Sequence, residues 1–208
     1  MILYDISKSI SFGLKELLQA YVAVSLAYTA ITANNGCGLI MFADEIIKYV
    51  PARMGKPHFM KIITAIAEAE PVDCQNTNLN KAIAKLMKEL PESLTFILSD
   101  FLYPFEPQYY FHRTIHGTNK HEVKGIQVLE EYEAGLPAGS KGLISLFDYE
   151  TGEDILLDLN QWQSYNVSMK QKLADIKYRL SHAGIDLLTI TPADSFFLKI
   201  NSFMRNMH

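Results

Sequence analysis

Oxygen-bearing side chains stand where three segments of the chain end or turn, and together they are suited to a hard metal ion. Asp5, Ser7 and Ser9 alternate along the segment that follows the first apolar run. Thr77 precedes a helical pattern, and Asp100 ends a strand-like run. Mg²⁺ prefers near-octahedral oxygen coordination with few carboxylates and some water. We therefore expect Asp5, Ser7, Ser9, Thr77 and Asp100 to bind a divalent cation, Mg²⁺ first, with Mn²⁺ or Ca²⁺ as alternatives.

The elements that must position these residues alternate between strand and helix. Strands are expected at residues 1–4, 37–42, 45–50, 94–98, 123–129 and 185–190, and helices at 12–33, 58–70, 79–90, from 162, and at 194–204. This alternation predicts an α/β fold with a three-layer, doubly wound, mostly parallel sheet, whose functional crevice lies beyond the carboxyl ends of the strands. Residues 45–50, ended by Pro51, are expected as an antiparallel edge strand.

The first helix is unusual because residues 17–43 contain no charged side chain. On helical spacing, the apolar stripe consists of Leu17, Val24, Tyr28 and Ile31, and the opposite side carries Lys15, Gln19, Ser25, Thr29 and Thr32. A membrane-spanning helix needs about 20 mainly apolar residues and tolerates little of this polarity. We therefore expect an amphipathic helix that packs on the core through its apolar stripe.

The segment 130–158 differs in character from the rest of the chain. It carries eight acidic side chains and one basic side chain, Lys141. Two strand-like runs flank a polar turn, which predicts an inserted acidic β-hairpin at residues 143–159. Its charge would suit a basic partner or keep the protein soluble by repulsion.

Composition excludes several classes of protein. Hydrophobic residues make up 49% and charged residues 20%, as in a folded globular chain, and the net charge of −4 disfavours nucleic acid as a partner. Cys37 and Cys74 are too few for a disulfide framework, and no secretory signal precedes them. The expected location is the cytoplasm without a membrane partner, or a membrane tether if an upstream segment is missing.

Two other interpretations compete with the metal site, namely a capping role for the serines and a zinc site of histidines. Ser9 or Ser11 could act as the N-cap of a helix rather than as a ligand. His112 and His116 are four residues apart on an expected helix, with His121 nearby, and that spacing is compatible with zinc. No cysteine or carboxylate is arranged around these histidines, which argues against zinc.

The chain resembles the metal-ion-dependent adhesion site of von Willebrand factor type A domains and, more closely, the bacterial family called domain of unknown function fifty-eight. The resemblance rests on Asp5-Ile6-Ser7-Lys8-Ser9-Ile10-Ser11-Phe12-Gly13, Gly38-Leu39-Ile40-Met41-Phe42, Pro51 to His58, Ser99-Asp100-Phe101, His121-Glu122-Val123, and Leu136-Pro137 through Asp148 to Gly152. It implies a von Willebrand factor A-like, Rossmann-like fold and a non-enzymatic, metal-dependent interaction module. It also implies a protein partner that donates a carboxylate to the metal, a MoxR-type AAA ATPase or its client, in bacterial complex assembly or maturation.

Departures from the family pattern keep two alternatives open. The family's Gly-Gly-Thr is Gln75-Asn76-Thr77 here, and the segment that usually precedes the first strand is missing. We therefore expect one N-terminally minimal domain over residues 1–208, and a degenerate scaffold without metal is one alternative. The other is a phosphatase-like enzyme with Asp5 as nucleophile, which is disfavoured because Ser7 stands where a second carboxylate is needed.

Overall fold

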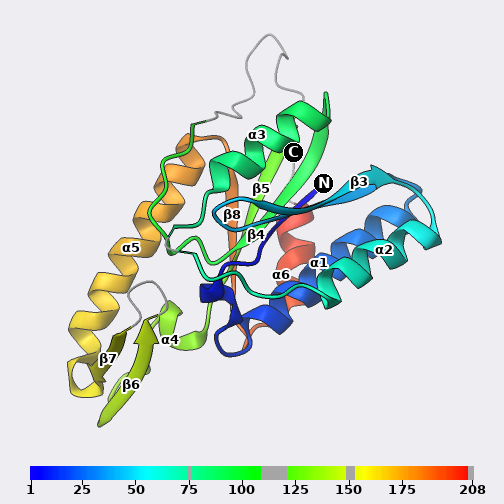
Figure 1. Cartoon of the computed structure of the whole chain (residues 1–208). Helices are drawn as coiled ribbons and strands as arrows, with labels where there is room; N and C mark the ends of the chain where they lie inside the picture. The colour runs from blue at the N-terminus through cyan, green and yellow to red at the C-terminus, as the bar shows by residue number, and fades with distance from the viewer. Residues whose placement is uncertain (75, 109–120, 149–152, 206–208) are drawn as a thin grey trace.

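The computed structural model describes residues 1–74, 76–108, 121–148 and 153–205, which Figure 1 traces from blue to red. Within these ranges, six strands form one sheet in the order β3-β2-β1-β4-β5-β8, and two form a separate sheet. The strands are β1 (Ile2–Asp5), β2 (Cys37–Phe42), β3 (Ile46–Arg53), β4 (Ser93–Ser99), β5 (His121–Val128), β6 (Leu143–Asp148), β7 (Glu153–Asp158) and β8 (Asp186–Ile190). The α-helices are α1 (Lys15–Thr32), α2 (Lys56–Ala67), α3 (Leu79–Glu89), α4 (Glu131–Ala134), α5 (Trp162–His182) and α6 (Phe196–Arg205), and 3-10 helices lie at Lys8–Ser11 and Leu159–Gln161.

The pairing of the main sheet explains where a functional crevice can form. β1 pairs in parallel with β2 and β4, and β5 pairs in parallel with β4 and β8. β3 runs antiparallel to β2 at the edge. Because each parallel strand returns through a crossover, the carboxyl ends of these strands share one edge of the sheet. The expected three-layer, doubly wound, mostly parallel α/β fold with an antiparallel edge strand is confirmed.

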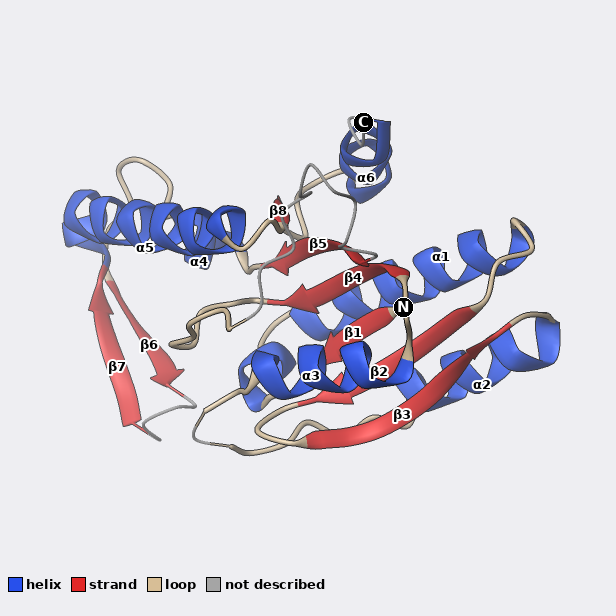
Figure 2. Cartoon of the chain, turned by 90° about the horizontal axis from the view of Figure 1, so that it is seen from above, coloured by secondary structure: helices blue, strands red, loops and turns tan. Residues whose placement is uncertain are grey.

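Helices cover both faces of this sheet, as Figure 2 shows from above. Tyr4 of β1 packs with Val22 of α1 and Ile62 of α2 on one face, where α6 also packs. Leu3, the preceding strand residue, points to the other face and packs with Ile83 of α3 in a core that α5 completes. All five side chains are at most 3% exposed. Full burial of such a side chain stabilises the fold by about 1.5–3 kcal/mol.

Helix α1 turns a different face inward from the one that its apolar stripe predicts. Leu17 and Tyr28 are 67% and 58% exposed, Val24 is half-buried, and Lys15 and Gln19 are buried. The expectation of a buried apolar stripe is therefore wrong for Leu17 and Tyr28, whereas Val24 and Ile31 are partly buried and pack against the core. The physical reason is that the first turns of α1 lie over the polar carboxyl ends of β1 and β4, where Lys15 and Gln19 find charged and carbonyl partners.

The edge strand also differs from its prediction. β3 continues through Pro51 to Arg53, so the expectation that Pro51 ends it is wrong. On an edge strand, the missing N–H of a proline can face away from the sheet and costs no ladder hydrogen bond.

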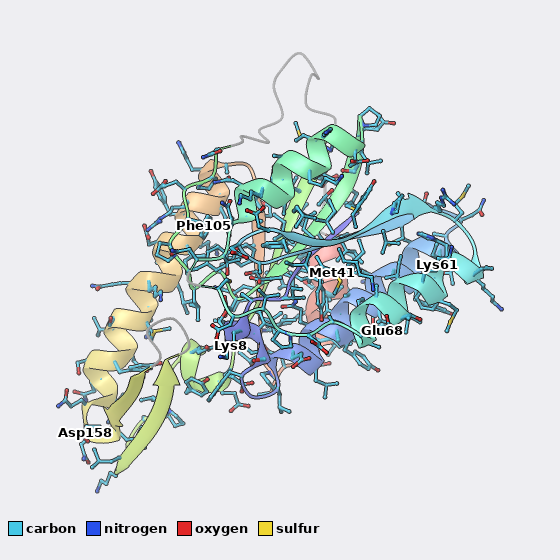
Figure 3. The ribbon with its side chains drawn as sticks, in the orientation of Figure 1. Lys8, Met41, Lys61, Glu68, Phe105 and Asp158 are labelled. Atoms are coloured by element: carbon cyan, nitrogen blue, oxygen red, sulfur yellow. The ribbon has the colours of Figure 1, made fainter. Side chains whose placement is uncertain are left out.

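The inserted hairpin forms from β6 and β7, which pair antiparallel from Leu143 opposite Asp158. Figure 1 places it at the far end of α5 from the main sheet, and Figure 3 shows Asp158 there, remote from Met41 in the sheet. The backbone N–H of Leu159 donates to the carbonyl of Gly142 at 2.8 Å, which closes the base of the hairpin. The expected hairpin turn at 149–152 lies outside the described residues.

Candidate metal centre

Two carboxylates meet at the carboxyl edge of the main sheet. Asp5 is the last residue of β1, and Asp100 follows Ser99, the last residue of the neighbouring strand β4. All three residues are fully buried, at 0% exposure. Because a buried carboxylate costs folding free energy unless it is hydrogen-bonded or charge-compensated, this edge requires partners.

The carboxylate of Asp5 is held by its own loop and by β4. Its Oδ1 accepts a hydrogen bond from the backbone N–H of Ser7 at 2.9 Å, and its Oδ2 accepts from the hydroxyl of Ser99 at 2.6 Å. The Ser99 hydroxyl oxygen accepts in turn from the N–H of Phe101 at 3.0 Å. Gln19 of α1 donates from Nε2 to the carbonyl of Asp5 at 2.7 Å. Each carboxylate oxygen keeps a second lone pair, so Asp5 is oriented but still able to act as a ligand.

The carboxylate of Asp100 forms a buried ion pair with the side chain of Lys15. Its Oδ2 accepts from Nζ of Lys15 at 3.1 Å, and the same ammonium donates to Oε1 of Glu133 in α4 at 2.8 Å. The Asp100 Oδ1 accepts from the N–H of Leu102 at 3.1 Å, and the Asp100 carbonyl accepts from Nε2 of Gln127 at 2.8 Å. Helices α1 and α4 and strand β5 therefore all position this aspartate, and burial protects its ion pair from screening.

Two backbone positions explain the path of the loops. Phe101 has φ +54°, in the left-handed region that bulky side chains rarely adopt. Its fully buried ring and its bond to Ser99 hold this turn, and such strained positions cluster at functional sites. Gly13 has φ +63°, and a side chain there would collide with Glu130. The glycine thus allows the chain to turn toward α1, where Glu130 accepts from the N–H of Leu14.

The hydroxyls predicted as ligands lie at the same edge. The Oγ atoms of Ser7 and Ser9 are 3.2 Å apart, with Ser7 buried and Ser9 half-buried. Thr77 is buried in the loop before α3. That loop is tied to the end of β2, because the N–H of Asn78 donates to the carbonyl of Ala43 at 2.7 Å. The structure thus gathers all five predicted residues at one edge, and their binding of a metal stays a prediction.

At this edge of the sheet, the carboxylates outnumber the ammonium groups. Burial and the charge of Asp100 raise the pKa of Asp5 to about 7, against two hydrogen bonds to its oxygens that act in the other direction. Burial raises the pKa of Glu133 despite its pairing with Lys15. Burial opposes the charge of Lys15, but Asp100 and Glu133 outweigh it and raise the pKa of the ammonium. Lys15 contacts Asp100 and Glu133 but not Asp5, so these three carboxylates carry two more negative charges than the one ammonium compensates when all ionise.

The donor set fits a hard divalent cation. Aspartate and serine or threonine oxygens are the ligands that Mg²⁺ prefers, and two uncompensated charges match its charge. A cavity of about 40 Å³ adjoins Asp5 and Ser7 on the side of α1 and α2, but its lining lacks Ser9, Thr77 and Asp100, so it is not the space that the proposed metal would occupy. The hydroxyl of Tyr103 is buried close to Ser99, yet makes no hydrogen bond of good geometry to any described residue. Such an orphaned group beside carboxylates points to a missing water or ligand.

Of the two competing interpretations, serine capping is wrong, and the zinc site lies mostly outside the described residues. The capping hypothesis for Ser9 and Ser11 is wrong, because neither the 3-10 helix nor α1 has a side-chain cap bond at its N-terminus. His112 and His116 lie outside the described residues, whereas His121 is buried with Nδ1 2.9 Å from the Ser93 hydroxyl. Within the described part of the chain, no three His, Cys, Asp or Glu side chains group as a metal site would require. A metal site at this edge therefore needs oxygen ligands besides carboxylates, and the predicted hydroxyls are such ligands.

The sequence alone does not identify most of the residues that hold the candidate ligands in place. Ser99 adjoins Asp100, and its type and position next to a strand end were the available signal. The helical spacing places Lys15 and Gln19 opposite the apolar stripe, yet both are buried. Glu133 was counted in the acidic segment as an exposed charge, but its side chain is 14% exposed and pairs with Lys15.

These features define a class of protein. A doubly wound sheet with an antiparallel edge strand, and an Asp-x-Ser-x-Ser loop at the carboxyl end of its first strand, make a von Willebrand factor A-like domain. The chain belongs to the family described as protein of unknown function DUF58, which it matches over residues 1–174. The match ends within α5, before β8 and α6 complete the fold.

Solved structures agree with this fold. An aerotolerance-related membrane protein from Bacteroides fragilis NCTC 9343 is 17% identical with a TM-score of 0.61, over 100% of this chain and 98% of that chain. The conserved hypothetical protein BatB from Bacteroides thetaiotaomicron is 14% identical with a TM-score of 0.56, over 99% and 98%. No curated protein matches the chain.

Among the described residues, no helix combines the length needed to cross a membrane with a sufficiently apolar sequence.

Proposed function

We propose that this chain is a non-enzymatic, metal-dependent protein-interaction module. The observation that supports it most is the pair of fully buried aspartates at adjacent strand ends, beside two serine hydroxyls 3.2 Å apart. In this proposal Asp5, Ser7, Ser9, Thr77 and Asp100 hold a divalent cation, Mg²⁺ first and Mn²⁺ or Ca²⁺ as alternatives. The cation would relieve the repulsion between the carboxylates, which is the reason to expect that it stabilises the fold.

The bound ion would supply a Lewis-acidic position for a carboxylate of a partner protein. The chain's own part is to hold the ligands: Ser99 and the Ser7 N–H orient Asp5, and Leu102 N–H orients Asp100. Ser9 is half-buried, so the hydroxyl side of the site is the side open to a partner. The partner that we propose from the family resemblance is a MoxR-type AAA ATPase or its client, in bacterial complex assembly or maturation in the cytoplasm.

The phosphatase-like alternative has less support. A nucleophilic carboxylate must be ionised and must reach the phosphorus, whereas Asp5 is fully buried and both its oxygens accept hydrogen bonds. In addition, Ser7 stands where that reaction needs a second carboxylate.

Calorimetric titration with Mg²⁺ and Mn²⁺ tests the proposal on the wild type, Asp5→Asn and Ser7→Ala. Asp5→Asn keeps the shape of the side chain and removes its charge, so we expect saturable heat in the wild type and none in this variant. Ser7→Ala deletes one neutral ligand, so it should weaken binding by roughly tenfold without abolishing it. Equal, negligible heats in all three proteins would contradict the proposal and leave the degenerate scaffold.

A further inference from the structure

Lys15 is a buried cation in direct contact with one of the proposed ligands. Its Nζ lies 3.1 Å from Oδ2 of Asp100 and 2.8 Å from Oε1 of Glu133, and its side chain is 1% exposed. A lysine is rarely buried unless it is paired, so this position in α1 is specialised. The metal-binding hypothesis gives the ammonium no role, although it occupies a ligand oxygen.

A second carboxylate and the start of two helices hold this ammonium in place. Oε2 of Glu133 accepts from the backbone N–H of Glu130 at 2.8 Å, as part of a capping box at the start of α4. The carboxylate of Glu130 accepts in turn from the N–H of Leu14, next to Lys15 in the chain. Figure 1 shows α4 beside the first turn of α1 at this end of the sheet. The ammonium is therefore positioned by rigid elements and is not a loosely held surface group.

An ammonium and a divalent cation that share one carboxylate oppose each other. Both are attracted to Asp100, and their mutual repulsion is strong where little water screens it. Conversely, Lys15 already compensates one of the negative charges that make the metal-free edge unfavourable. A protein with this lysine needs the metal less for folding and binds it less tightly.

We propose that Lys15 is a built-in countercharge that lowers the affinity of the site for divalent cations and stabilises the metal-free protein. The inference rests on the proposed function, because it assigns a determinant of affinity to the same site. It makes the occupancy of the site responsive to metal concentration, since weak binding keeps the ion exchangeable. Glu133 is then a positioning residue, which sets how much of the ammonium's attraction falls on Asp100.

The test measures Mg²⁺ and Mn²⁺ affinity by calorimetry on the intact chain with Lys15→Met. Methionine fills a similar volume without charge, so both metals should bind at least about tenfold more tightly than to the wild type. The same variant should melt at a lower temperature without metal and gain more from added Mg²⁺ than the wild type does. The matched control is Lys48→Met, which removes an equal charge outside the Asp-x-Ser-x-Ser loop, where Lys48 of β3 pairs with Glu68 on the surface. We expect less than about a threefold change there, because water and salt screen that charge.

The outcomes separate this inference from the function on which it rests. Unchanged or weaker binding by Lys15→Met, with a wild type that binds, overturns the role of Lys15 and leaves the metal-dependent module intact. A change in Lys48→Met as large as in Lys15→Met also overturns it, because net charge alone would then explain the gain. Absence of binding in every protein overturns both proposals.

A second variant serves if Lys15→Met fails to fold. Glu133→Gln leaves Asp100 as the sole charged partner of the ammonium, so metal binding should weaken by about threefold or more. Glu131→Gln removes an equal charge from an exposed position of the same helix and is the control. Equal affinities of these two variants would contradict the inference.

Discussion

A carboxylate can be buried next to another carboxylate when donors fix both of its oxygens, and Asp5 is such a case. The Ser99 hydroxyl bridges two groups: it donates to Asp5 and accepts from the N–H of Phe101, whose backbone is in the left-handed region. One hydroxyl therefore supports the orientation of a proposed ligand and the turn that follows β4.

Removal of this hydroxyl gives the first prediction. Ser99→Ala should lower the free energy of unfolding by about 1–3 kcal/mol, because it leaves a buried N–H and a carboxylate oxygen without their partner. Urea unfolding measures the loss. Ser25→Ala removes a hydroxyl that bonds within α1, to the carbonyl of Tyr21, and should stay within about 0.5 kcal/mol of wild type. Similar losses in both variants would show that Ser99 has no special role.

His121 supplies a pH dependence away from the site. Burial lowers its pKa below the ordinary 6.5, more than the charge of Glu92 raises it. The folded state thus binds the proton less tightly than the unfolded chain, so stability from this group is present above about pH 6.5 and is lost as the pH falls below it. Urea unfolding of wild type and His121→Gln between pH 5 and 8 should give a difference that changes only below about pH 6.5. A difference that is constant with pH would contradict this assignment.

At the level of single residues, the sequence points to the candidate ligands, whose binding of a metal stays a prediction, but not to the residues that support them. Asp5 and Ser7 are found from residue type, spacing and position after an apolar run. Ser99, Gln19 and Lys15 cannot be found in this way, because their roles depend on which elements lie side by side in the fold. Burial of Lys15 even opposes the usual rule for charged side chains, and the contact with Asp100 explains it.

At the level of single elements, the sequence predicts the bounds of a strand better than the face that a helix turns inward. β2 was predicted with the bounds that the structure shows, because a continuous apolar run is typical of a strand covered on both faces. The inward face of α1 could not be predicted from its pattern, since half of that face meets polar strand ends. Its apolar stripe is instead left in part at the surface, where Leu17 is 67% exposed.

The orientation of α1 is testable by one substitution at two positions. Val22→Asp should lower the free energy of unfolding by at least about 3 kcal/mol, because Val22 is 0% exposed and the charge would lack a partner. Leu17→Asp should change it by no more than about 0.5 kcal/mol. Val24, which is half-buried, should give an intermediate loss. Chemical denaturation checks all three, and equal losses at Leu17 and Val22 would contradict the orientation of the helix.

At the scale of the whole molecule, the six-stranded sheet and the hairpin are separate hydrogen-bonded units. β6 and β7 pair with each other, and the bond between Leu159 and Gly142 brings the ends of the hairpin together. β8, in contrast, pairs with β5 inside the main sheet, although the family match ends before it. The turn residues predict the hairpin, and the alternation of strand and helix predicts β8. The sequence does not predict how far either element lies from the candidate metal site.

Excision of the hairpin tests this division. Removal of residues 143–158, with Gly142 joined directly to Leu159, should leave one cooperative transition within about 5 °C of the wild-type melting temperature. Removal of 186–205, which deletes β8 and α6, should abolish cooperative unfolding because it opens the main sheet. Loss of folding in the hairpin deletion would show that the insertion is structural. Retention of folding in the other deletion would show that β8 is dispensable.

The most direct test of the central claim is anomalous diffraction from crystals of this chain grown with Mn²⁺. The account predicts one anomalous peak at the carboxyl edge of the sheet, within about 2.0–2.6 Å of oxygens from the Asp-x-Ser-x-Ser loop or Asp100. Crystals of Asp5→Asn grown in the same solution should lack that peak. A map without a peak at this edge at saturating Mn²⁺, or with the same peak in Asp5→Asn, would contradict the account.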